Sequence, residues 1–90
     1  MARIIPWSEM QDLPAGSTVW EECNDFSHKS WIARITVRAE IQEALSPVTI
    51  RMRYTLMGGA EFTQETRVSP ALRYWDAEPT PEEMAAAPWT

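Results

Sequence analysis

In the stretch 31-WIARITVRAEIQ-42, apolar and polar side chains alternate at every position except Ile32. One face of an extended chain would carry Trp31, Ala33, Ile35, Val37, Ala39 and Ile41, and the other Ile32, Arg34, Thr36, Arg38, Glu40 and Gln42. Successive side chains of a β-strand point to opposite sides. A period of two over this length therefore predicts a strand with one buried face.

The same period recurs elsewhere in the chain. It predicts strands over residues 18–23, 48–57 and 61–68, and a last short strand in 71-ALRYWD-76. Between the strands at residues 48–57 and 61–68, a two-residue glycine turn would mix the buried and exposed faces. We therefore expect a three-residue loop, 58–60, that pairs Leu56 with Phe62.

Short helices are expected at both ends of the chain. Ser8 followed by Gln11 fits a capping box for a turn of helix over residues 9–13. In 80-TPEEMAAA-87, Thr80 is a good N-cap, a proline follows it, and Glu83 completes a second capping box. A helix this short is not stable alone, so we expect Trp89 to dock it on the rest of the domain. The alternative is an exposed Trp89 that inserts into a partner.

These elements predict a single small β domain over residues 1–90. Four or five antiparallel strands with a helix at each end would form an SH3-like barrel or a curled half-barrel. A chain of 90 residues fits one domain, and its five tryptophans supply the bulk that a small core needs.

Charge and cysteine content suggest a setting for the protein. The formal net charge is −5, which argues mildly against general nucleic-acid binding. A single cysteine, Cys23, favours a reducing compartment, and no apolar run approaches the length of a membrane span. We expect a cytoplasmic protein with no membrane partner.

The sequence lacks the residues that a catalytic centre of this size would need. His28 is the only histidine, and its five-residue separation from Cys23 across a polar loop is a weak signal for a nucleophile and its base. A zinc site needs about four nitrogen or sulfur ligands. The adjacent carboxylates Glu21 and Glu22 would point to opposite faces of a strand. We expect no enzyme, no metal and no cofactor.

The polar face of the predicted sheet carries most of the positive charge. Five of the eight basic residues lie there: Arg34, Arg38, Arg51, Arg53 and Arg67. Pairing Ile41 with Val48 would set Arg38 opposite Arg51, and the hairpin would bring Arg67 there too. Like charges so placed need a counter-ion, and guanidinium groups bind phosphates and carboxylates bidentately.

Three interpretations of this arginine face stay open. It is a solvated strand face, or a surface for a protein partner or a second copy of the chain, or a site for an anionic small molecule such as a nucleotide. Nucleic acid belongs to the last group and is the less favoured partner.

The two ends of the chain also carry a resemblance. The segment 73-RYWDAEPTPEEMAAAPW-89, with 13-LPAGSTVWEE-22, resembles small uncharacterised phage and prophage proteins of gut Firmicutes. The resemblance implies a mobile-element protein in the cytoplasm of a bacterial host, and it assigns no catalytic residues to this chain. It implies a binding protein that antagonises host defence, by sequestering a nucleotide signal or by occupying a defence protein. The alternative is a small nucleic-acid-associated β-barrel module.

Overall fold

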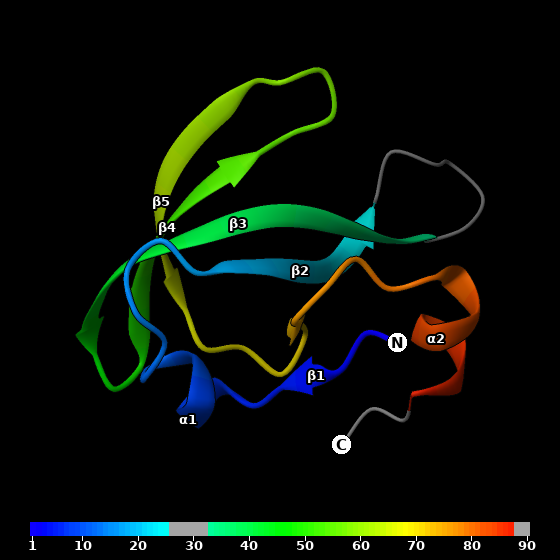
Figure 1. Ribbon diagram of the computed structural model, residues 1–90, viewed down its shortest axis with the longest axis horizontal. Helices are drawn as coiled ribbons and strands as arrows, with labels where there is room; N and C mark the ends of the chain where they lie inside the picture. Colours follow the sequence, from blue (N-terminus) through cyan, green and yellow to red (C-terminus); the bar gives the residue numbers. More distant parts are fainter. Residues whose placement is uncertain (26–32, 88–90) are drawn as a thin grey trace.

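The computed structural model describes residues 1–25 and 33–87, which form one antiparallel sheet with a short helix near each end (Figure 1). The strands are β1 (Ile4–Ile5), β2 (Thr18–Asp25), β3 (Ala33–Ser46), β4 (Thr49–Thr55), β5 (Glu61–Arg67) and β6 (Arg73–Trp75). The helices are α1 (Trp7–Met10) and α2 (Pro81–Ala86). The expectation of a mainly β fold is confirmed.

The sheet is open. Its strand order is β1-β6-β2-β3-β4-β5, so β1 and β5 are its two edges and do not close on each other. The SH3-like barrel is therefore not confirmed. The sheet has six strands where four or five were expected, because β1 has only two residues and a period cannot be recognised over so short a segment.

The core lies on one face of the sheet, which α1 and the adjoining residues cover. Its buried members are Ile5, Met10, Val19, Ala39, Ile41, Ile50, Met52, Tyr54 and Tyr74. The predicted alternation is confirmed for Ala39 and Ile41 and for the middle of β4. It does not hold at the start of β3, where Ile35 is 39 % exposed. Trp31 lies outside the described residues.

The β4–β5 hairpin has a longer loop than predicted. Tyr54 pairs with Phe62, so five residues, 56–60, connect the strands, and the expected pairing of Leu56 with Phe62 is wrong. Gly58 and Gly59 both adopt positive φ, which the loop requires. Because the register differs by two residues, each side chain keeps the face that the sequence predicted.

The β3–β4 connection also differs from the prediction. β3 continues to Ser46, and the turn consists of residues 47–48. Two register shifts interrupt the pairing, between Ile41 and Glu43 and between Ala44 and Ser46. Because the turn has only two residues, Ile41 pairs with Met52 and not with Val48, and the bulges change that register by two residues. Such bulges displace every later pair along the strands.

The two helices differ in how well they were predicted. α1 begins after Pro6 without a side-chain cap, and Gln11 instead donates through Nε2 to the carbonyl of Ser46 at 2.9 Å, so the first capping box is wrong. In α2 the capping box is present: Glu83 N donates to Thr80 Oγ1 at 3.1 Å, and Thr80 N to Glu83 Oε1 at 3.0 Å.

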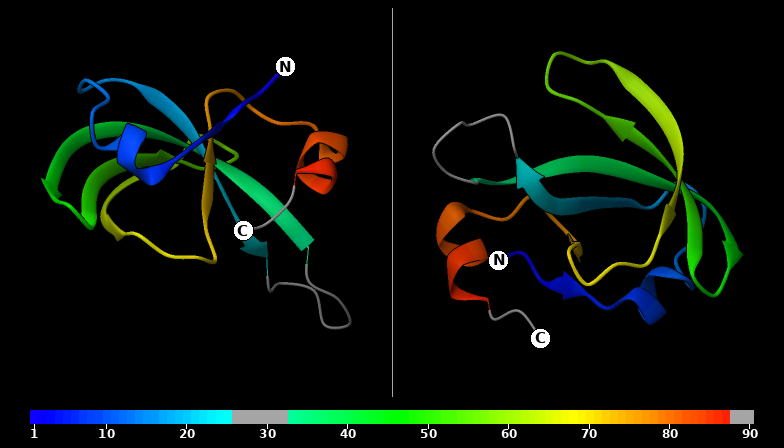
Figure 2. Two further views of the ribbon diagram at one scale, coloured as in Figure 1. Left: turned by 90° about the horizontal axis from the view of Figure 1, so that it is seen from below. Right: turned by 180° about the vertical axis from the view of Figure 1, so that it is seen from behind.

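The carboxy-terminal helix is attached to both the amino terminus and the sheet. Ala2 N donates to Glu83 Oε2 at 2.9 Å, so α2 and the start of the chain lie side by side, as Figure 2 shows. Arg73 on β6 donates to the carbonyls of Met84 at 2.6 Å and Ala87 at 3.0 Å. The predicted anchor, Trp89, lies outside the described residues.

Candidate functional site

Two members of the arginine face are neutralised by carboxylates on neighbouring strands. Arg51 Nη1 lies 3.0 Å from Glu43 Oε2, and its Nη2 lies 3.5 Å from Glu65. Arg53 Nη2 lies 2.9 Å from Glu40 Oε2, and its Nε lies 3.7 Å from Glu61. The observed strand register places these four glutamates beside the two arginines.

The expected opposition of like charges is wrong. Arg38 lies opposite Thr55 rather than Arg51, and Arg67 lies opposite Thr49. The short β3–β4 turn sets Glu40 and Glu43 beside the arginines, and the β4–β5 register sets Glu61 and Glu65 there. Arg34 pairs with Asn24 through the backbone of β3, and its side chain is outside the described part of the structure.

The arginine face is therefore not one strongly positive surface. Each of the two central guanidinium groups already has two carboxylate partners, which an incoming phosphate would have to displace. The pairs are partly exposed, and such surface ion pairs contribute roughly 0–1 kcal/mol each to stability. Their effect here is to cancel charge.

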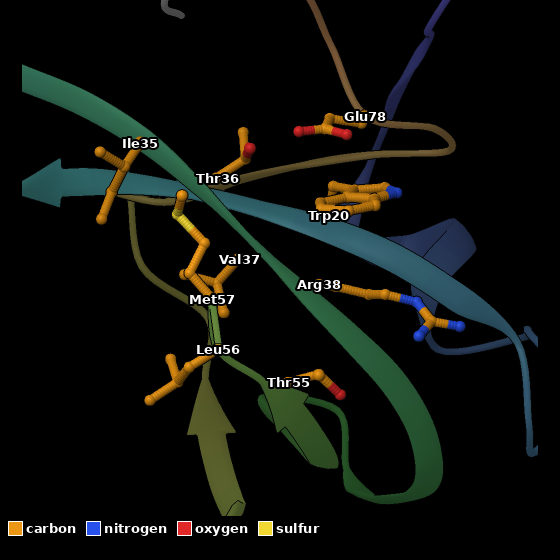
Figure 3. Close-up of a pocket in the computed structure, with 9 residues that line it drawn as sticks. All are labelled: Trp20, Ile35, Thr36, Val37, Arg38, Thr55, Leu56, Met57 and Glu78. Carbon is orange, nitrogen blue, oxygen red and sulfur yellow. The ribbon is translucent and has the colours of Figure 1, made fainter. Parts of the chain in front are cut away.

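A groove opens where β4 leaves β3. Pairing between these strands ends at Arg38 and Thr55, and beyond it the β4–β5 hairpin bends away from β2 and β3 (Figure 1). The groove has a volume of about 610 Å³. Its lining, drawn in Figure 3, consists of Trp20, Ile35, Thr36, Val37, Arg38, Thr55, Leu56, Met57 and Glu78.

The lining combines apolar side chains with a few polar groups. Figure 3 places Trp20 on one side of β3, with Leu56 and Met57 on the other. Leu56 is 41 % exposed and Met57 is fully exposed, so the hairpin presents apolar surface that no described residue covers. Arg38 and Glu78 supply one charge of each sign. An apolar groove with few convergent polar groups is the usual form of a binding site.

The groove also borders an unpaired strand edge. Ile41 N donates to Ser17 O at 2.8 Å, so the backbone of Ile41 faces β2. Backbone groups alternate in direction along a strand, so those of Arg38 and Thr36 face the other way. On the β4 side of β3, Arg38 pairs with Thr55. Within residues 1–25 and 33–87, no strand pairs with Thr36 on this side. Thr36 thus offers a donor and an acceptor to an added strand.

The two adjacent glutamates of β2 are buried and belong to separate clusters. Glu21 Oε2 accepts from the hydroxyls of Tyr54 at 2.6 Å and Tyr74 at 3.1 Å. Burial, and then the charge of Glu21, raise the pKa of both tyrosines well above the usual value. Glu22 accepts from Arg73, and from Trp75 Nε1 at 2.8 Å. Neither glutamate lines the groove, and both accept hydrogen bonds from residues of other strands of the sheet.

Little else in the described chain points to chemistry. Cys23 is half-buried on β2, and His28 lies outside the described residues. Within residues 1–25 and 33–87, no cluster of three metal-ligating side chains occurs and neither helix has the length and apolarity to cross a bilayer. Comparison with protein-family models, curated proteins and solved structures gives no match.

Of the residues that line the groove, only Arg38 was predicted from the sequence to belong to a site, and the apolar ones were not. Leu56 and Met57 beside two glycines were a possible signal, since an apolar pair at a hairpin tip is unusual. Locating the groove requires knowing that β4 pairs with β3 only as far as Thr55. That is a property of the register, which periodicity does not determine.

Proposed function

We propose that the protein is a non-catalytic binding protein that holds an extended segment of another protein in the groove between β3 and the β4–β5 hairpin. One observation carries this proposal: apolar side chains that no described residue covers flank a strand edge whose backbone groups are unpaired. An extended peptide needs both features, because main-chain hydrogen bonds supply affinity and side-chain contacts supply specificity.

The groove suggests which segments would bind. Main-chain pairing at Thr36 aligns the ligand with β3, and every second side chain then faces the same way. Those side chains would contact Trp20 or the Leu56–Met57 pair, so apolar residues at alternate positions are favoured. Arg38 and Glu78, at the rim, would favour opposite charges at the corresponding ends of the ligand.

The arginine ion pairs weigh against the other interpretations. A nucleotide or a nucleic acid would meet Arg51 and Arg53 already engaged with carboxylates. Of the alternatives that the sequence left open, a protein partner is therefore favoured. From the resemblance of the chain ends to phage proteins, we further propose that this partner is a host protein, such as a defence protein, in the bacterial cytoplasm. For the fold, we propose the curled half-barrel, because the sheet is open.

Selection from a library of extended ten-residue peptides tests the proposal. We expect the wild-type protein to enrich peptides with apolar residues at alternate positions. Leu56→Lys should lose these peptides, because it places a charge in the groove. Val48→Lys is the matched control: Val48 is also 41 % exposed but lies at the opposite end of β4. Equal enrichment by the Leu56 variant, or none by the wild type, would contradict the proposal.

A further inference from the structure

The sheet also ends in an exposed edge strand, β5, which lies away from the groove. β5 is the last strand in the sheet order, and of its seven residues only Thr66 is buried. Edge strands are usually blunted by charged side chains, especially lysine, by proline, by a bulge or by a covering segment, because their free backbone groups pair readily with another chain. The charges of β5 are of both signs: Glu61, Glu65 and Arg67. β5 contains neither proline nor lysine, and no register shift interrupts its pairing with β4.

The free backbone groups of β5 belong to four residues. Leu56 N donates to Ala60 O at 2.8 Å, and Val68 N donates to Val48 O at 2.9 Å, so even-numbered residues of this segment face β4. By alternation, the N–H and C=O groups that face outward are those of Glu61, Thr63, Glu65 and Arg67. They form a row of eight groups along the edge.

These four residues are self-complementary when the strand meets itself in antiparallel orientation. If residue 64 pairs with residue 64 of a second copy, Glu61 lies opposite Arg67 and Thr63 lies opposite Glu65. All outward-facing residues then pair with outward-facing residues, so every free backbone group gains a partner. Opposite charges directly across antiparallel strands are favourable.

Neighbouring registers lack this complementarity. A shift of two residues in one direction sets Glu61 opposite Glu65, and the reverse shift sets Glu65 opposite itself. Like charges directly opposite are unfavourable. A shift of one residue sets outward-facing groups against inward-facing ones and breaks the ladder. The charge pattern therefore selects one register, which has twofold symmetry.

The remaining contacts at this edge agree with that register. Arg67 forms no ion pair with any described residue, and Glu61 has two long contacts, 3.7 Å to Arg53 Nε and 3.4 Å from Thr55 Oγ1, so neither side chain is held by a short polar contact. On the other face of the strand, Phe62 and Val68 are 42 % and 45 % exposed. The same register places them beside Thr66 and Ala60 of the second copy, where each loses exposed surface.

We propose that two copies of the chain pair through β5, with Glu61 of each copy opposite Arg67 of the other, to form one continuous twelve-stranded sheet. This interface goes beyond the proposed function, because it lies on the opposite side of the hairpin from the groove. A dimer would present two grooves, and a partner with two binding segments would gain avidity from them.

Charge exchange tests the interface. Sedimentation of the wild-type protein should show a dimer that dissociates on dilution. Glu61→Arg and Arg67→Glu should each weaken dimerisation by about tenfold or more, since symmetry converts two attractions into two repulsions. An equimolar mixture of the two variants should restore a dimer, because each supplies the charge that the other needs. Glu82→Arg, an equal charge change on the exposed face of α2, should leave the dimer unchanged.

Amide hydrogen exchange provides a readout that does not depend on the variants. On raising the protein concentration, the amides of Glu61, Thr63, Glu65 and Arg67 should gain protection. Those of Phe62 and Gln64, which face β4, should be protected throughout. A wild-type protein that stays monomeric at about 1 mM, the Kd of a very weak complex, would overturn the proposal. So would single variants that dimerise as well as the wild type.

Discussion

Arg73 and Glu22 form a buried ion pair directly across the β2–β6 strand pair, with Nε of Arg73 2.5 Å from Oε1 of Glu22. The side chains are 7 % and 0 % exposed. The same guanidinium donates to the carbonyls of Met84 and Ala87 at the end of α2. One side chain therefore satisfies a buried acid and holds the carboxy-terminal helix on the sheet.

Removing one member of this pair should destabilise the fold strongly. Arg73→Met leaves the carboxylate of Glu22 buried without its cation, and breaking a buried pair in this way costs about 3–5 kcal/mol. Urea denaturation measures the loss in the free energy of unfolding. Arg3→Met is the control, because Arg3 forms only exposed ion pairs, with Glu9 and Asp76. A cost below about 1 kcal/mol for Arg73→Met would contradict this account.

The buried tyrosines should make the fold sensitive to alkali. The pKa of Tyr54 and of Tyr74 is raised by burial and by Glu21, whereas the pKa of a tyrosine in the unfolded chain is about 10. Above that pH the unfolded state binds fewer protons than the folded state, so stability falls as pH rises. The slope should approach about 1.4 kcal/mol per pH unit for each tyrosine.

Urea unfolding at several pH values on either side of 10 measures this slope. Tyr74→Phe should remove roughly half of it, because one of the two titrating groups is gone. Tyrosinate absorbance of the native protein should stay low over the same range. Early ionisation of both tyrosines in the native state would show that they are not held as described.

The arginine ion pairs should matter little for stability or for partner binding. Arg51→Gln with Arg53→Gln removes four partly exposed contacts, each of which contributes roughly 0–1 kcal/mol. We expect the double variant to fold and to bind a selected peptide as the wild type does.

Nucleic-acid binding provides the complementary test of this face. Fluorescence anisotropy with a labelled single strand should show only weak binding by the wild type at about 50 mM salt. Tight binding that weakens steeply towards about 200 mM salt, and that the double glutamine variant loses, would instead support the nucleic-acid module.

Acid should loosen the start of α2. Thr80 N, and then Ala2 N, donate to Glu83 and lower the pKa of its carboxyl below the usual value. The contribution of this carboxylate is present above the unfolded pKa and is lost as pH falls through the lower folded pKa. An NMR titration should show the Thr80 and Ala2 amides shifting together with the Glu83 carboxyl. Independent titration of the three groups would contradict the shared contact.

The features that the sequence predicted correctly are those determined by neighbouring residues. The alternation identified the faces of β3 and β4, and Thr80 with Glu83 identified the cap of α2, because each pattern lies within a few residues of chain. Glu21 and Glu22 were correctly placed on opposite faces of β2. Their burial was not foreseen, since it depends on Tyr54 and Arg73 from distant strands.

The features that were missed depend on register. The two-residue turn at 47–48 and the five-residue loop at Gly58 shift the pairs by a few residues, and that shift brings Glu43 to Arg51 in place of a second arginine. The same shift ends the β3–β4 pairing at Thr55 and so creates the groove. A register shift of two residues leaves every side chain on the same face of the sheet, so the alternation of side chains alone does not locate the groove.

Amide hydrogen exchange at Thr36 is the decisive test that an extended peptide binds in the groove beside β3. With a selected peptide bound, the Thr36 amide should become protected, and chemical shifts should change at Thr36, Leu56 and Met57. Val48→Lys should give the same pattern and Leu56→Lys should give none. An unprotected Thr36 amide in the bound state, with shift changes confined to Arg51 and Arg53, would place the binding site on the arginine face and contradict the account.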